Sequence, residues 1–124
     1  MSLVLDAGAL IAVERGDRDT AAVIEVARQQ RRKVIVPAGV VGQAWRGGGR
    51  RVRLARLVNA RDVLVESLTD AGARAAGALC GAAGTADVID ASVVLVARRH
   101  TASVLSSDRA GLEVLDPTIH VVDC

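Results

Sequence analysis

The chain has 124 residues, 51% of them hydrophobic, which is enough for a single domain with a buried core. Its 16 lysines and arginines and 14 acids leave a net charge of +2, and Trp45 is the only aromatic side chain, which excludes binding of bases on aromatic platforms. No uncharged apolar run reaches the roughly 18 residues of a transmembrane helix, and the N-terminus lacks the features of a signal peptide. We therefore expect a cytoplasmic protein without a membrane segment.

The first half of the chain is predicted to alternate short strands with helices. A strand is expected over 3–5, a helix starts at 7–10, and Asp17 caps a second helix. The apolar residues that share one face of this second helix are Ala22, Val23, Val26 and Ala27. A β-branched strand follows over 34–36, and a helix with proline in its first turn follows over 37–45.

The second half continues this alternation after a flexible Gly-Gly-Gly break at 47–49. Three helices are expected, over 50–58, 69–81 and 87–99. Three strands are expected, over 62–66, 103–106 and 119–122, and Val63 and Val65 give the first of them an alternating pattern. Strands that alternate with helices are typical of a parallel sheet with crossover connections. The predicted fold is therefore an α/β fold, with residues 1–124 in one domain.

Three aspartates lie where predicted strands end or helices begin. Asp6 follows the first strand, Asp90 lies in the first turn of the helix over 87–99, and Asp108 follows the strand over 103–106. Side chains at such positions tend to converge at one edge of an open α/β sheet. Several carboxylates held together repel one another unless a hard cation such as Mg²⁺ lies between them, so the pattern predicts a metal site.

Each of these acids also fits a purely structural role. Asp6 and Asp108 could cap a helix or a turn, and Asp87 could be the N-cap of the helix that contains Asp90. We favour the N-cap for Asp87, although its spacing from Asp90 also lets the two share a metal-facing side of the helix. For Asp90 we favour function, because a charge on the first inward turn of so apolar a helix is costly without a partner.

Basic residues gather in the middle of the chain. Residues 26–61 contain ten bases and no acid, whereas residues 62–124 contain nine acids and four bases. A basic segment near candidate metal ligands suits a polyanionic substrate. The candidates for contacts with phosphate groups are Arg46, Arg50, Arg51 and Arg53. A solvated helix face, or a surface for an acidic partner, accounts for the same residues.

The motifs of the chain resemble those of PIN-domain ribonucleases of the VapC toxin type, and the resemblance covers nearly the whole length. Residues 3–11 resemble the first motif, a strand followed by aspartate, small residues and leucine. Residues 37–47 resemble the second, a helix with proline, glutamate and a Trp-Arg pair. In the third, eighteen residues separate Asp90 from Asp108, as in the helix-strand-acid unit of the family.

The resemblance implies an α/β/α sandwich around a mainly parallel sheet and a Mg²⁺- or Mn²⁺-dependent endoribonuclease. It implies that Asp6, Asp90 and Asp108 surround the metal ion, with Asp87 as an accessory acid. It further implies a homodimer that acts as the toxin of a type II toxin–antitoxin pair, inhibited by a cognate antitoxin that enters the active-site groove. Trp45 is expected in the core or in the dimer interface.

The chain departs from the family at Gln43, which stands where the second motif has its glutamate. An amide is a weaker cation ligand than a carboxylate, although Gln43 could orient a water or a phosphate and Asp87 could restore the missing charge. Two alternatives to the nuclease therefore stay open. One is a catalytically silent PIN-like module that binds RNA or an antitoxin, and the other is a small α/β domain whose acids are structural.

Overall fold

The computed structural model of the chain describes residues 2–46 and 51–124. Within these residues, one sheet holds five strands in the order β3-β2-β1-β4-β5, and all neighbouring strands are parallel. The strands are β1 (Ser2–Leu5), β2 (Val34–Pro37), β3 (Val63–Glu66), β4 (Ala102–Ser106) and β5 (Val121–Asp123). The predicted parallel α/β arrangement is confirmed.

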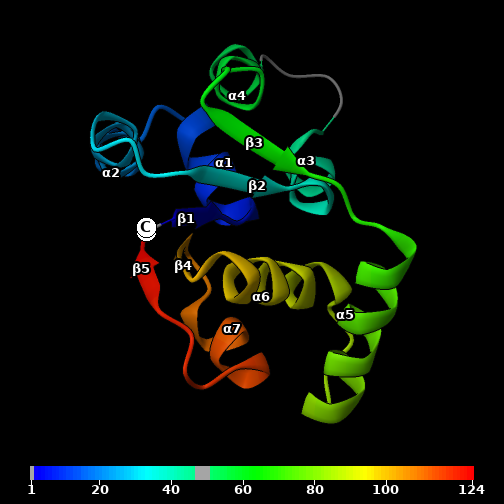
Figure 1. Ribbon diagram of the computed structural model, residues 1–124. Coiled ribbons are helices and arrows are strands. Elements are labelled where there is room, and N and C mark those ends of the chain that lie inside the picture. The colour runs from blue at the N-terminus through cyan, green and yellow to red at the C-terminus, as the bar shows by residue number, and fades with distance from the viewer. Residues whose placement is uncertain (1, 47–50) are drawn as a thin grey trace.

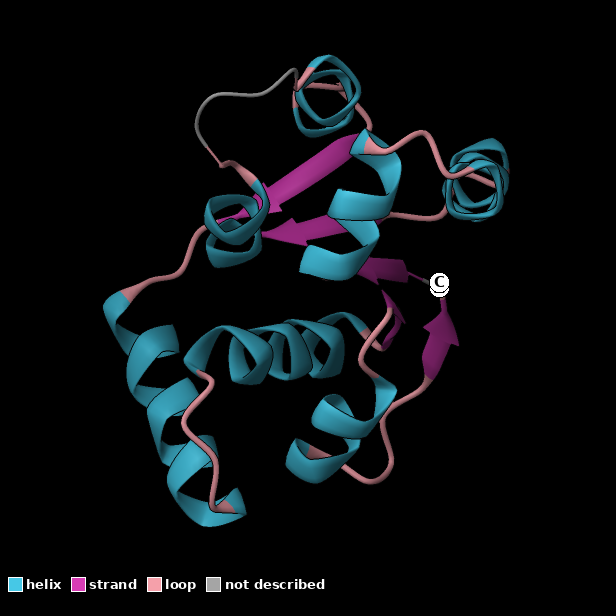
Figure 2. Cartoon of the chain, turned by 180° about the vertical axis from the view of Figure 1, so that it is seen from behind, coloured by secondary structure: helices cyan, strands magenta, loops and turns pink. Residues whose placement is uncertain are grey.

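Helices cover both faces of this sheet (Figures 1 and 2). In the described part of the chain they are α1 (Ala7–Glu14), α2 (Arg18–Gln29), α3 (Ala38–Ala44), α4 (Val52–Val58), α5 (Asp70–Ala83), α6 (Val88–His100) and α7 (Arg109–Leu115). Helices α1, α2 and α4 pack on one face, whereas α6 packs on the other with α5 and α7 against it. The result is the α/β/α sandwich that the resemblance implies.

The inner strands form the core of the protein. Every residue of β1 and β2 is buried, as expected for parallel strands covered by helices on both faces. Strand β3 differs, because Leu64 and Val65 are 43% and 38% exposed. The predicted alternation therefore holds only at Val63, which is buried. A strand at the edge of a sheet has a neighbouring strand on one side only, so its side chains are less completely covered.

The face that α2 buries differs from the prediction. Thr20, Ile24 and Ala27 point into the core, whereas Ala22 and Val26 are exposed. The buried stripe contains a threonine whose hydroxyl donates to the Asp17 carboxylate at 2.8 Å, so this polar side chain is satisfied in the interior. The prediction is confirmed for the buried Ala27 and for Val23, which packs partly buried against the core, and it is wrong for Ala22 and Val26.

Helix boundaries also shift from those predicted. Pro37 ends β2 and caps α3, which begins at Ala38, and α4 begins at Val52. Helix α7 is not among the predicted elements, and it begins where the Asp108 carboxylate accepts the backbone N–H of Gly111 at 3.1 Å. The predicted glycine break at 47–49 and the predicted helix start at residue 50 lie outside the described residues.

Helices α5 and α6 meet at a sharp bend. Thr69 caps α5, because its hydroxyl accepts the backbone N–H of Gly72 at 3.0 Å. Across residues 2–46 and 51–124, no single helix is long and apolar enough to cross a membrane. Only α5 and α6 taken together, across a bend of 107°, reach that length and composition.

Parallel strands place their carboxyl ends at one edge of the sheet. Asp6 directly follows β1, α3 follows β2, and Asp108 lies two residues beyond β4. Strand β1 lies between β2 and β4, so these three chain segments are neighbours. Helix α6 packs on β1, β4 and α3. The candidate acids therefore lie at the edge where α/β folds build their sites.

Candidate active site

Asp6 and Asp108 are joined by a buried hydroxyl. Asp6 is only 5% exposed, and its Oδ1 accepts the backbone N–H of Ala9 at 3.1 Å. The Ser106 hydroxyl donates to Oδ2 of Asp6 and accepts the backbone N–H of Asp108 at 2.9 Å. Ser106 therefore fixes both acids relative to each other.

Ser106 is a site residue that the sequence reasoning missed. A signal was present, since a hydroxyl residue two positions before an aspartate is typical of a local turn that bonds to the backbone. The bond to Asp6 left no such signal, because it joins residues 100 positions apart. It depends on the pairing of Leu5 with Leu105 in the neighbouring strands.

Three of the candidate acids are helix N-caps. Asp6 caps α1, Asp87 caps α6 by accepting the backbone N–H of Asp90 at 3.0 Å, and Asp108 caps α7. The structural role favoured for Asp87 is confirmed, and the capping alternative for Asp6 and Asp108 is also correct. Capping uses Oδ1 of Asp87 and of Asp108, so it leaves their Oδ2 atoms for other contacts.

Among these acids, Asp90 has the most strongly raised pKa. Burial raises its pKa most, and the charges of Asp87, Asp108 and Asp6 raise it further, to about 6. The pKa of Asp6 is also raised, because burial outweighs the hydrogen bonds from Ser106, Ala9 and Gly8. The four acids are therefore within electrostatic reach of one another, at an edge with an excess of negative charge.

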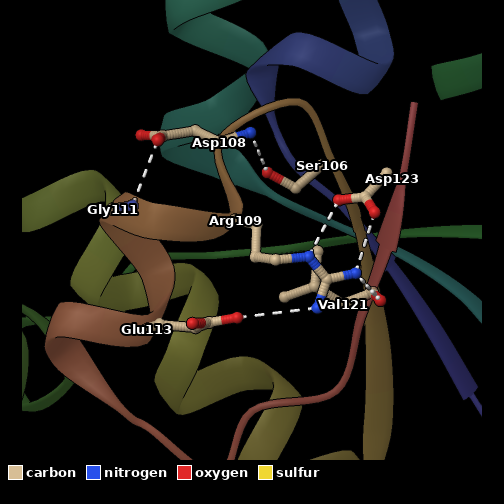
Figure 3. A network of polar contacts seen from close by, with 7 residues as sticks. All are labelled: Ser106, Asp108, Arg109, Gly111, Glu113, Val121 and Asp123. Atoms are coloured by element: carbon tan, nitrogen blue, oxygen red, sulfur yellow. Dashed lines mark hydrogen bonds and ion pairs between the residues drawn. The ribbon is translucent and has the colours of Figure 1, made fainter.

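Arg109 leaves the Asp108 charge uncompensated although it is the next residue. Figure 3 shows its guanidinium turned away from the Asp108 carboxylate and toward β5. It bonds to both carboxylate oxygens of Asp123, at 3.0 and 2.9 Å, and to the Val121 carbonyl at 2.9 Å, and it pairs with Glu113 at 3.5 Å. These contacts hold α7 against β5, so Arg109 stabilises the fold and does not neutralise the candidate acids. We call the carboxyl edge of the sheet with Asp6, Asp87, Asp90 and Asp108 the acid edge.

The donor set matches a hard divalent cation in its chemistry. Carboxylate oxygens are the ligands that Mg²⁺ and Mn²⁺ prefer, and an added positive charge would relieve the repulsion that raises the pKa of Asp90. In the part of the chain that the structure describes, no three His, Cys, Asp or Glu side chains form a group that could hold a metal ion. The charges of the acids thus act on one another, but the described side chains do not form a complete metal-binding site.

The sequence and the structure of the chain were compared with those of known proteins. The sequence model of the PIN domain matches residues 3–116, a range that contains all four acids. The chain belongs to the PIN domain family. A solved structure, that of FitAB bound to an IR36 DNA fragment, has the same fold, with a TM-score of 0.66 at 15% identity over 98% of this chain and 94% of that one. A comparison with curated proteins finds no match.

Gln43 of this PIN domain lies on the side of α3 that faces the first turn of α6. Gly39, one helical turn earlier on the same side, touches Ile89 so closely that an added Cβ would come within 2.5 Å of the Ile89 Cδ1. Ile89 is the residue before Asp90. The half-buried Gln43 is therefore a neighbour of the acid edge, although among the described residues its side chain forms no hydrogen bond with an acid.

The candidate phosphate-binding arginines of the PIN domain separate into two places. Arg46 donates to the Gln43 carbonyl at 3.0 Å and Arg51 to the Arg46 carbonyl, so both lie at the end of α3. Arg53 donates to the Glu14 carbonyl at 3.3 Å, at the far end of α1. An eight-residue helix is about 12 Å long, so Arg53 is distant from Asp6. Arg50 lies outside the described residues.

Trp45 lies on the surface of the PIN domain rather than in its core. It is 41% exposed, and the Arg51 guanidinium lies over its ring at 5.1 Å. Within residues 2–46 and 51–124, none of Arg46, Arg51 and Arg53 forms an ion pair with an acid. Their charges are therefore available to an anionic ligand.

Proposed function

We propose that this PIN domain is a Mg²⁺- or Mn²⁺-dependent endoribonuclease and the toxin of a type II toxin–antitoxin pair. The observation that carries the proposal is the arrangement at the carboxyl edge of the sheet, where Ser106 bonds to Asp6 and to the backbone of Asp108 and the charges of Asp6, Asp87 and Asp108 act on Asp90. Such a concentration of negative charge on a PIN fold suits a bound cation better than a structural role. In this proposal residues 1–124 act as one domain.

The proposed metal ligands are Asp6, Asp90 and Asp108, with Asp87 as an accessory acid. A divalent cation held there would supply a Lewis acid that polarises the scissile phosphate and lowers the pKa of an attacking water. Asp6 is held rigidly by Ala9 and Ser106, whereas Asp90 is only half-buried in its helical turn. Asp6 is therefore the acid with both oxygens held by hydrogen bonds, and Asp90 is the more exposed of the two.

The substrate and partners are proposed on the same basis. Arg46 and Arg51, together with Arg50 and the more distant Arg53, are proposed to bind RNA phosphates, which needs charge but no base recognition. A cognate antitoxin that covers the acid edge, a homodimer and a cytoplasmic location complete the proposal. Nucleic-acid binding is consistent with FitAB, a fold neighbour whose structure contains DNA.

Cleavage of structured RNA by the purified, partner-free protein tests the enzyme. Cleavage should require Mg²⁺ or Mn²⁺, stop in EDTA and fall by about 100-fold in Asp6→Asn and Asp90→Asn. Asp70→Asn, which changes an exposed acid on α5, is the matched control and should cleave normally. Mn²⁺ should also raise the Tm of the wild type and not that of Asp90→Asn. Metal-independent cleavage, or equal activity in all variants, would overturn the proposal.

Gln43 favours a second candidate function, that of a catalytically silent PIN domain that binds RNA or an antitoxin without cleaving RNA. This reading is favoured by the neutral amide beside the acid edge and by the open ligand set among the described residues. Gln43→Glu separates the two functions. A nuclease weakened by the amide should gain activity severalfold and bind Mn²⁺ more tightly in the variant, as measured by cleavage rate and thermal shift. Tight RNA binding without cleavage in either protein would favour the silent module.

A further inference from the structure

A cavity of about 420 Å³ adjoins the acid edge on the α1 side of the sheet. Three of its lining residues come from the carboxyl ends of strands: Gly8 lies two residues after Asp6, Ser107 precedes Asp108, and Cys124 follows β5. The backbone N–H of Cys124 donates to the Ser106 carbonyl at 3.0 Å, which fixes this corner of the cavity beside the residue that holds Asp6. The cavity therefore lies beside chain neighbours of Asp6 and Asp108 and extends along α1, although none of the four acids lines it.

Two further observations link the cavity to the acids. A Cβ built on Gly8 would come within 2.0 Å of the Ser107 hydroxyl oxygen, so glycine is needed for Ser107 to reach this position. Burial raises the pKa of the Cys124 thiol to about 11, and the charge of Asp6 contributes next. The first observation brings Gly8 and Ser107, which lie within two residues of Asp6 and Asp108, into direct contact, and the second agrees with a position of Cys124 near Asp6.

The lining does not suit a phosphate group. It contains one cation and one anion, Arg15 and Asp17, whereas phosphate sites collect several cations or backbone N–H groups. Ile11, which is 38% exposed, and Ala12 supply an apolar wall. The Ser107 hydroxyl and the Arg15 guanidinium supply hydrogen-bonding groups around it. The Asp17 carboxylate adds an acceptor, although its two oxygens already accept from the backbone N–H of Asp19 and from the Thr20 hydroxyl. A neutral, flat group with hydrogen-bonding edges matches this combination.

We propose that this cavity receives the nucleobase of an RNA nucleotide adjacent to the scissile phosphate and gives the nuclease its base preference. The inference rests on the proposed function and adds a subsite to it. Single-stranded RNA is read through bases that are splayed out and bonded along their edges. The only aromatic residue, Trp45, does not line the cavity, so Arg15, Asp17 and Ser107 would read the base by hydrogen bonds instead of stacking.

The test combines abasic RNA with variants of the cavity. A single abasic ribose is moved through every position of a short single-stranded RNA that the protein binds, and RNA affinity is measured in EDTA. One abasic position should weaken binding to the wild type by about tenfold. That effect should shrink in Ala12→Leu, which narrows the cavity, and in Arg15→Ala. Arg74→Ala removes the same charge on α5 and should keep the full abasic effect.

The outcomes separate this inference from the proposed function. If every abasic position weakens binding equally in the wild type and in both cavity variants, the cavity holds no base. Arg15→Ala guards against misfolding of Ala12→Leu, because the α1 cap at Arg15 uses its backbone N–H and not its side chain. A wild type that shows the coupled abasic effect in EDTA but never cleaves with Mg²⁺ or Mn²⁺ would contradict the nuclease and leave the subsite standing.

Discussion

At the scale of single residues, two carboxylates of the acid edge differ in their surroundings: Asp6 is hydrogen-bonded, whereas Asp90 has a raised pKa. Asp6 has hydrogen bonds to both of its oxygens. Asp90 is raised in pKa from 3.8 to about 6, so the folded protein binds its proton more tightly than the unfolded chain does. The free energy of unfolding therefore falls as pH rises through this window, and above it the full cost of the Asp90 charge is present.

Asp90→Asn should increase the free energy of unfolding at pH 7.5 by about 1 kcal/mol, a value reduced for the solvent that reaches this half-buried group. The gain should shrink as pH falls below about 6, because the wild-type carboxyl then becomes neutral as well. Urea unfolding in EDTA at several pH values measures both effects, with Asp70→Asn as the control. A gain that does not depend on pH would show that the charge of Asp90 is not its source.

Ser106→Ala should lower the free energy of unfolding by about 1–2 kcal/mol, because it leaves the buried Asp6 oxygen without its donor. It should also reduce the proposed nuclease activity, since among the described residues no other side chain bonds to both Asp6 and Asp108, although the Asp6 backbone N–H also donates to the Leu105 carbonyl at 3.2 Å. Ser103→Ala is a matched control on the same strand. It removes a buried hydroxyl bonded to His120 at 2.7 Å, and it should cost similar stability without reducing the rate of cleavage. Equal loss of cleavage in both variants would indicate a general effect of destabilisation.

At the scale of elements, α4 owes its position to α1. Its N-cap residue, Arg51, makes no capping bond with its side chain. Instead the Glu14 carboxylate, at the end of α1, accepts the backbone N–H of Leu54 at 2.8 Å, and the Glu14 carbonyl accepts from Arg53. A cap from a residue 40 positions away makes the start of α4 a tertiary feature of the fold.

Glu14→Ala should therefore lower stability by about 1 kcal/mol and speed hydrogen exchange at the amides of α4. Glu14→Gln keeps an acceptor oxygen and should restore most of the protection. Amide hydrogen exchange followed by mass spectrometry compares the two variants, with Glu25→Ala as an exposed control on α2. Unchanged exchange in Glu14→Ala would mean that α4 is held by its apolar packing alone.

At the scale of the whole molecule, charge is distributed unevenly. Acids gather at the carboxyl edge of the sheet, and the arginines at the end of α3 form no ion pairs with acids within the described residues. An RNA backbone along this end of α3 would meet Arg46 and Arg51 before it reached the acids. Arg53, at the other end of α1, would contribute less.

Arg46→Ala and Arg51→Ala should each weaken RNA binding and reduce the slope of log K against log salt by about 0.7, the value for one phosphate contact on a single strand. Arg53→Ala should have a smaller effect. Affinity measured in EDTA at several salt concentrations tests this, with Arg74→Ala as the control. If the slope does not change in any variant, the α3 arginines serve a protein partner instead.

The sequence by itself determined the alternation of strands and helices, the parallel α/β class, the PIN resemblance and the positions of Asp6, Asp87, Asp90 and Asp108. These follow from periodicity, capping and spacing, which act over a few residues and are visible in the linear chain. Only the tertiary structure decided that Ser106 joins Asp6 to Asp108, that Glu14 caps α4, that Arg53 lies away from the acids and that a cavity opens beside Gly8. Each of these depends on strand pairing or helix packing between residues distant in sequence, for which no local pattern exists.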